Sequence, residues 1–395
     1  MVVIACISSR NPLATPLNSF LTIKRDSHAI SSSSSPGPAG SATSSVPTVI
    51  LTRCMCLVKM ASLRAAASCI VVMHRVEKSE WQNRTAVTSL ILLGFGYVED
   101  LNVLLFFLFL AIYLVIMSGN LLIVVLVMVE QHLHTPMYFF LANLSFLESC
   151  YTSTILPRML ASFVTRDKTI SLLGCVLQMH FFSTMAATEC YLLAAMSYDR
   201  YLAICKPLHY ATLMNERKCI LLVSVSWIIG LLLITILTCF LSQLNFCNQY
   251  TIDHFFCDFT PIVRLSCSDT KVVETAAFIT SSIGILPTFL ITLASYVFII
   301  TTILKIPSIT GRQKAFSTCS SHLTVVSIFY GSLMFVYVLP TMEKFKDLNK
   351  VLSFLYTVLT PMVNPFIYSL RNKEVQGSLI KAVYQFRGFS RIQKK

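Results

Sequence analysis

Residues 175–205 read CVLQMHFFSTMAATECYLLAAMSYDRYLAIC, a long apolar run that ends on a neighbouring acid and base, Asp199 and Arg200. A hydrocarbon core about 30 Å thick needs roughly 20 apolar residues for one helical crossing, so this run is long enough to span a bilayer. Because the membrane interior offers no water to backbone groups, a spanning run of this kind must be helical. The stretch therefore predicts a transmembrane helix with a charged pair at one end.

The whole chain has the composition of a membrane protein. Of its 395 residues, 55 % are hydrophobic and 12 % are charged, and its mean hydropathy is +0.70, whereas ordinary soluble domains are much more polar. Runs of similar length and character, bounded by charge or proline, are found at 101–128, 137–163, 175–204, 219–241, 276–304, 316–339 and 351–370. The sequence therefore predicts an all-α membrane protein, a bundle of seven transmembrane helices.

The distribution of lysine and arginine predicts the orientation. The connections after the third and fifth predicted helices and the C-terminal tail are strongly basic, whereas basic and acidic residues balance in the loops on the other face. Basic loops stay in the cytoplasm, so we expect an extracellular N-terminus and a cytoplasmic C-terminus in the plasma membrane. Attraction to anionic lipid accounts for much of the net charge of +13, and no nucleic-acid-binding motif is seen.

Four cysteines are predicted on the outer face. Cys247, Cys257 and Cys267 share one long polar loop, and Cys175 begins the third helix on the same face. Four cysteines in an oxidising compartment suit two disulfides. The spacing alone leaves all three possible pairings open.

The first 72 residues do not belong to the helical pattern. The tract SSSSSPGPAGSATSSVP at 31–47 buries too little apolar surface to fold alone. We expect residues 1–72 to be either a gene-model or alternative-start extension, with translation beginning at Met73, or a disordered tail. Residues 73–100 are expected to form an extracellular N-terminal segment. Within it, the tripeptide NRT makes Asn83 a glycosylation acceptor.

Two carboxylates are predicted to share one buried layer. Glu189 comes eleven residues before Arg200, which places it about 16 Å deeper on nearly the same helix face. Glu148 lies at a similar depth, about 18 Å into the second predicted helix. With Asn120 and Asn364, the pair predicts either a structural hydrogen-bond network or a functional site that shares a proton or holds a cation. Sodium at Glu148 and Glu189 is the candidate cation.

Four motifs resemble those of a receptor family. They are LHTPMYFFLANLSFLE at 133–148, MSYDRYLAICKPLHY at 196–210, KAFSTCSSHLTVV at 314–326 and PMVNPFIYSLRNK at 361–373. In this order and on these helices they resemble the motif set of vertebrate olfactory receptors, within the rhodopsin-like G-protein-coupled receptors. The resemblance extends from Met73 to the C-terminus. It implies an odorant receptor that binds a small volatile molecule within the bundle and raises cyclic AMP through a heterotrimeric stimulatory G protein.

The resemblance also implies two disulfides, Cys175–Cys257 and Cys247–Cys267. The chain departs from the family pattern at one position, because the family usually has aspartate where this chain has Glu148. The longer side chain reaches towards the layer of Glu189, which puts the geometry of a cation site in doubt.

The charged pair at the end of the third helix is implied to be a latch. In such receptors, Asp199 and Arg200 hold the cytoplasmic ends of the third and sixth helices together at rest, and Arg200 turns towards the G protein on activation. The residues expected to form the activation switch and the G-protein contacts are Asp199, Arg200, Tyr201, Asn364, Pro365 and Tyr368.

Position along the helices predicts a ligand pocket enclosed by the outer halves of the third, fifth, sixth and seventh helices. The residues expected to line it are Met179, His180, Phe182, Ser183, Ala186, Ala187, Tyr330, Leu333, Met334 and Tyr337. This lining is mostly apolar with a few hydroxyls, which suits a small volatile molecule of low polarity.

The receptor domain is expected to span residues 101–371 and the cytoplasmic tail residues 372–395. Within the tail, an apolar stripe beside basic residues is formed by Val375, Leu379, Ile380, Val383 and Tyr384. The pattern predicts a short amphipathic helix on the inner leaflet.

Other functions are open at this point. One is a receptor of the same fold for an endogenous metabolite outside the olfactory epithelium. Another is an ion-coupled transporter that uses Glu148 and Glu189, but transporters usually show repeated halves and broken helices, which the sequence lacks. An enzyme is disfavoured because the sequence shows no nucleophile and base pair, no metal-ligand cluster and no cofactor motif.

Overall fold

The computed structural model describes residues 89–95, 101–247, 250–338, 346–367 and 375–380. The predictions made for residues 1–72, Asn83 and Tyr368 lie outside this part of the chain. So do those for residues 372–374 and 381–395 of the tail.

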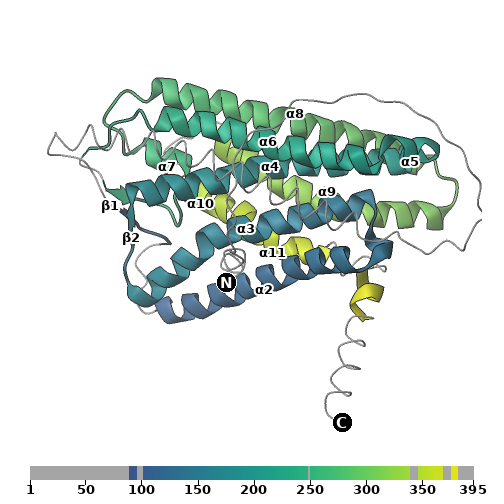
Figure 1. The fold of residues 1–395 in the computed structure, drawn as a ribbon, viewed down its shortest axis with the longest axis horizontal. Coiled ribbons are helices and arrows are strands. Elements are labelled where there is room, and N and C mark those ends of the chain that lie inside the picture. The colour runs from purple at the N-terminus through teal and green to yellow at the C-terminus, as the bar shows by residue number, and fades with distance from the viewer. Residues whose placement is uncertain (1–88, 96–100, 248–249, 339–345, 368–374, 381–395) are drawn as a thin grey trace, which may run out of the picture. The chain divides into compact units, whose positions relative to one another are not determined.

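Helices lie over each of the seven apolar runs (Figure 1). The first five are α2 (Asn102–Val129), α3 (Pro136–Thr165), α4 (Leu172–Cys205), α6 (Glu216–Leu241) and α8 (Lys271–Leu304). The sixth run holds α9 (Ile309–Leu333) and the π-helical turn η4 (Met334–Val338), and the seventh holds α10 (Lys346–Phe354), the π-helical turn η6 (Leu355–Leu359) and α11 (Thr360–Pro365). Several helices begin before the apolar run does, because polar residues continue the helix beyond the apolar stretch.

Shorter elements connect the long helices. They are the 3-10 turns η2 (Gln131–Leu133) and η3 (Pro207–His209) and the short helices α5 (Tyr210–Leu213) and α7 (Phe259–Val263). Residues 375–380, in the predicted amphipathic segment, are helical, with Val375 buried and Ile380 exposed.

Three of the described helices, α2, α6 and α8, are long and apolar enough to cross a membrane. Their outer faces carry large apolar side chains such as Phe107, Leu232 and Leu290, which are 62 %, 56 % and 59 % exposed. By contrast, α3 and α4 bury polar residues, among them Glu148 and Glu189, between the helices. The described chain is therefore mostly helical and has apolar faces suited to lipid.

Packing centres on α4, which contacts α3, α6 and α8, while α2 packs on α3 and α11. The main apolar core lies between these helices and includes the fully buried rings of Tyr151, Phe182, Phe329 and Tyr356. The end of the bundle that carries Cys175 is called the disulfide end below, and the other end of α4 is called the Arg200 end.

A small sheet at the disulfide end was not predicted. Strand β1 (Ser89–Leu92) pairs antiparallel with β2 (Thr169–Ser171) and parallel with β3 (Thr251–Ile252), in the order β2-β1-β3. The strands are short and far apart in the sequence, so no local pattern of residues predicts them. A second apolar cluster lies beneath the loop between α6 and α8, and it buries Leu90, Leu92 and Ile252. The expected all-α fold thus carries a small β cap.

Candidate functional site

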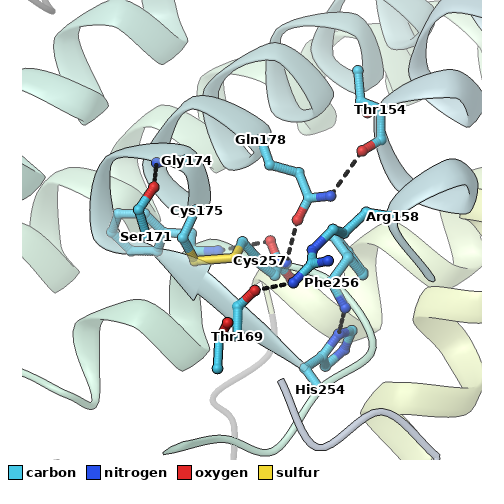
Figure 2. The surroundings of a disulfide bond; sticks show 12 residues. Thr154, Arg158, Thr169, Ser171, Gly174, Cys175, Gln178, His254, Phe256 and Cys257 are labelled. Atoms are coloured by element: carbon cyan, nitrogen blue, oxygen red, sulfur yellow. Dashed lines mark hydrogen bonds between the residues drawn. A yellow bond between two sulfur atoms is a disulfide. The ribbon is translucent and has the colours of Figure 1, made fainter. Parts of the chain in front are cut away.

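At the disulfide end, two disulfides hold the loop between α6 and α8. Cys175, in the first turn of α4, is bonded to Cys257 with 5.3 Å between their Cα atoms, and Cys247 is bonded to Cys267 within the loop. These are the pairings that the family resemblance implies. Figure 2 shows how Gln178 adds to the attachment: its side-chain oxygen accepts from the Cys257 N–H at 3.0 Å, and its amide donates to a carbonyl of α3 at 2.7 Å. The loop is thus fixed to both α3 and α4.

A cavity of about 470 Å³ lies beside this loop. Its walls come from α4, α6, α7, α8 and the end of the sixth run, α9 with η4. Of the residues predicted to line a ligand pocket, those that do so are Phe182, Ser183, Ala186, Ala187, Leu333 and Tyr337. The volume is within the range of small-molecule sites, roughly 300–1,000 Å³.

Four residues predicted to line the pocket are not part of its wall: Met179, His180, Tyr330 and Met334. Met179 is buried in the apolar cluster beneath the loop. His180 faces α6, where its Nδ1 lies 2.9 Å from the hydroxyl of Thr238, and the Tyr330 hydroxyl donates to a carbonyl of α4 at 2.8 Å. Depth along a helix fixes how far a residue lies from the membrane surface, but not which neighbour its side chain faces.

The fifth predicted helix, α8, was expected to help enclose the pocket, but none of its lining residues was named, and the parts of the wall on α6 and α7 were not predicted. On α8 the wall comprises Glu274, Ala277, Phe278, Thr280, Ser281, Gly284 and Ile285, and on α6 Leu233, Ile234 and Leu237. One signal was available for α8, because Thr280, Ser281 and Gly284 are small or polar residues within an otherwise apolar run. Small residues in membrane helices usually mark a face turned to protein and away from lipid.

A chain of hydrogen bonds joins the loop, the cavity wall and the seventh run. The hydroxyl of Tyr337 in η4 donates to the carboxylate of Asp258, 2.9 Å from Oδ1 and 3.0 Å from Oδ2. The same hydroxyl lies 2.8 Å from that of Tyr356 in η6. Both tyrosines lie in π-helical turns. Such turns are rare in proteins as a whole, and many of them occur at functional sites. Because the Tyr337 hydroxyl donates its hydrogen bond to Asp258, the Tyr337 oxygen accepts a hydrogen bond from the Tyr356 hydroxyl.

Burial shifts the pKa values of two loop side chains. Asp258 is 3 % exposed, and burial raises the pKa of its carboxyl to about 6, despite the opposing hydrogen bonds from the Phe259 N–H and Tyr337. His254 is 5 % exposed, and burial lowers the pKa of its imidazole to about 4. Both residues line a second cavity of about 210 Å³, next to the ion pair in which Lys350 Nζ lies 2.5 Å from Asp253 Oδ1.

The two carboxylates predicted to share a buried layer, Glu148 and Glu189, lie on α3 and α4. Glu148 and Glu189 are both fully buried and close enough to interact electrostatically. Asn364 donates to Glu148, and Asn120 donates to the Pro361 carbonyl at 3.1 Å. In the described part of the chain, no three His, Cys, Asp or Glu side chains are placed to hold a metal ion together.

At the Arg200 end, the charged pair is anchored to several elements. Arg200 Nε lies 3.8 Å from Asp199 Oδ2 and 2.7 Å from Met137 Sδ at the start of α3. Asp199 is buried and accepts from the Tyr210 hydroxyl of α5 at 2.8 Å. The charge of Arg200 is also close enough to His322 of α9 to act on it electrostatically.

Of the other predicted switch residues in the described part of the chain, Tyr201 follows this pair on α4, and Asn364 and Pro365 lie on α11. Tyr201 packs on a small apolar cluster that contains Tyr296 of α8 and Cys319 of α9. The Tyr296 hydroxyl lies 2.5 Å from Nδ1 of His322, which joins α8 to α9. Asn364 and Pro365 are buried in α11.

Comparison with known proteins identifies the family. The profile of the olfactory receptor family matches residues 109–386. Olfactory receptor 6F1 from Homo sapiens is 50 % identical over 299 residues, covering 76 % of this chain and 97 % of that protein. Olfactory receptor 2AP1 from Homo sapiens is 49 % identical over 296 residues, covering 75 % and 96 %, and olfactory receptor 6E1 from Mus musculus is 48 % identical over 309 residues, covering 78 % and 99 %. The chain therefore belongs to the olfactory receptor family, whose members are G-protein-coupled receptors and not enzymes.

Proposed function

We propose that this receptor binds a small volatile odorant in the 470 Å³ cavity and activates a stimulatory G protein, so that cyclic AMP rises. The cavity is the observation that carries the proposal. Its wall is largely apolar, and hydroxyls such as those of Ser183, Thr280 and Ser281 are among the polar groups able to orient a ligand, while the charged Arg264 and Glu274 lie at the exposed side. The best-suited ligand is an uncharged molecule with one or two hydrogen-bonding atoms.

The proposed topology has seven transmembrane helices: α2, α3, α4, α6, α8, α9 with η4, and α10 through α11. The disulfide end faces the cell exterior, because disulfides persist in an oxidising compartment, and the Arg200 end lies at the basic, cytoplasmic face. Residues 73–100 form an extracellular segment glycosylated at Asn83, residues 101–371 the receptor domain, and residues 372–395 a cytoplasmic tail with an amphipathic helix on the inner leaflet.

For activation we propose a two-state movement of α9 relative to α4. At rest, Asp199 and Arg200 keep the Arg200 end closed, aided by the contact between Tyr296 and His322. An odorant in contact with Tyr337 acts on the same helical run, since η4 continues α9. The moving contacts include Tyr201, Asn364, Pro365 and Tyr368, and the layer of Glu148 and Glu189 connects the two ends as a hydrogen-bond network or a cation site.

The test is a cyclic AMP assay with a broad odorant panel, in cells that express an olfactory-type stimulatory G protein and the chain from Met73. We expect a dose-dependent rise for at least one odorant, and Arg200→Ala should weaken it by about ten-fold or more because the coupling residue is lost. Arg217→Ala is the matched control, since it removes the same charge from an exposed site at the start of α6. Silence of the wild type across the panel, with surface display verified by antibody, contradicts the proposal.

A further inference from the structure

The cavity reaches the seam between α6 and α8. At this seam its wall includes Leu233 of α6 and Phe278, Ser281 and Gly284 of α8. Phe278 is 54 % exposed, so this part of the cavity wall is also part of the outer surface of the bundle. Because α6 and α8 are both apolar enough to cross a membrane, the outer surface at the seam is suited to contact with hydrocarbon.

Helix α6 packs closely on α4 but loosely on α8. A Cβ atom added at Gly230 of α6 would lie 2.5 Å from Thr188 Oγ1 and 3.0 Å from the Thr184 carbonyl oxygen of α4. A Cβ atom added at Gly284 of α8 would meet a single atom within 4 Å, Cδ1 of Leu233, at 3.9 Å. The space next to Gly284 is therefore bordered by one flexible side chain, that of Leu233.

The helix α8 continues through Pro287 but lacks one backbone hydrogen bond beside the cavity. Pro287 has no N–H to donate to the carbonyl of Ile283, and the Tyr191 hydroxyl of α4 donates to that carbonyl at 3.3 Å. Before the proline, the buried residues of α8 are Val273, Gly284 and Ile285, whereas beyond it they are Thr288, Thr292, Ser295, Tyr296, Ile299 and Ile303. The part of α8 that borders the cavity is thus less firmly packed than the part beyond it.

We propose that the seam between α6 and α8 is a lateral portal through which uncharged apolar odorants pass from the outer leaflet into the cavity. The cavity wall also includes Arg264 and Glu274, which are exposed and charged and mark the side that faces water. Each CH₂ group favours hydrocarbon over water by about four-fold, so an apolar odorant is concentrated on the lipid side of the seam. The portal rests on the proposed function for the identity of its ligand, and on the packing of α6 and α8 for its place.

The test measures access to the cavity without odorant or G protein. The receptor carries Ser183→Cys as a reporter in the cavity wall and is reconstituted in lipid nanodiscs. Two thiol reagents are compared: N-hexylmaleimide, which partitions into lipid, and a methanethiosulfonate with a quaternary ammonium group, which stays in water. Labelling of residue 183 is followed by peptide mass spectrometry, which separates it from the native cysteines.

Filling the seam should slow only the lipid-borne reagent. We expect Phe278→Trp, and independently Leu233→Trp, to slow labelling by N-hexylmaleimide about ten-fold, which corresponds to a barrier raised by roughly 1.4 kcal/mol. The matched controls are Ile279→Trp and Leu232→Trp, at neighbouring positions that are 51 % and 56 % exposed and lie outside the cavity wall. They should leave the rate within about two-fold of the parent.

Several results would overturn the portal. One is equal slowing by seam and control variants, and another is an unchanged rate in both seam variants. A third is equal slowing of both reagents, which would mean that tryptophan fills the cavity itself. Leu233→Trp keeps the test decisive should Phe278→Trp not fold. Since no odorant takes part, a negative cyclic AMP result and a negative portal result are separate outcomes.

Discussion

Cys257→Ser is expected to lower the free energy of unfolding by about 4.5 kcal/mol, and Cys267→Ser by about 3.3 kcal/mol. The Cys175–Cys257 bond joins residues 82 apart in the sequence, whereas the Cys247–Cys267 bond joins residues 20 apart. A cross-link that closes a longer loop removes more entropy from the unfolded chain. Loss of the Cys175–Cys257 bond should also abolish the response to odorant. The reason is that α7, whose residues form part of the cavity wall, begins directly after Cys257 and Asp258.

The measurement is unfolding of the purified variants in mild detergent, combined with the cyclic AMP response of the same variants. Cys205→Ser is the control: this half-buried cysteine is outside both disulfides, and serine keeps a group able to hydrogen-bond to Thr302. It should change the free energy of unfolding by less than about 1 kcal/mol. An equal or larger loss for Cys267→Ser than for Cys257→Ser would contradict the argument from loop length.

The long helices follow from the sequence because each of their causes is local. Apolar runs of sufficient length must be helical in a membrane, and their starts carry local signals. Pro136 is tolerated in the first turn of α3, where no N–H is needed, and the Asn215 side chain caps α6 by accepting from Lys218 N–H at 3.0 Å. The β cap has no such signal, because β1, β2 and β3 come from segments separated by whole helices.

The candidate site was predictable only in part. Periodicity places Glu189 and Arg200 on one face of α4, and family resemblance supplies the disulfide pairings. The wall on α6 and α8 depends on how these helices pack, for example on the close approach of α6 to α4 at Gly230, which a list of apolar runs does not contain. The contact between Asp258 and Tyr337 joins residues 79 apart in the sequence, and it depends on how the loop, held by the disulfides and by Gln178, lies over the bundle.

Acid should have opposite effects on the stabilities of two loop variants relative to wild type. The folded-state pKa of Asp258 is raised to about 6 from 3.8, so its contribution to stability is full at low pH and is lost as the pH rises through 6. The folded-state pKa of His254 is lowered to about 4 from 6.5, so its contribution is full above pH 6.5 and is lost as the pH falls through 4. Each shift corresponds to about 3 kcal/mol, and in wild type the two largely cancel between pH 4 and 6.

Removing one group exposes the effect of the other. Between pH 7.4 and 4, Asp258→Asn should lose about 3 kcal/mol of unfolding free energy relative to wild type, and His254→Gln should gain about as much. Asparagine still accepts from Tyr337 and Phe259, and glutamine can still accept from the Phe256 N–H that His254 Nδ1 holds at 3.5 Å. Urea unfolding in detergent over this pH range measures both, with the double variant as control. The double variant should run parallel to wild type, since neighbouring charges such as Lys350, Asp253 and Arg264 are common to all four proteins. If the curves of unfolding free energy against pH for both single variants run parallel to the wild-type curve, neither group titrates as its burial requires.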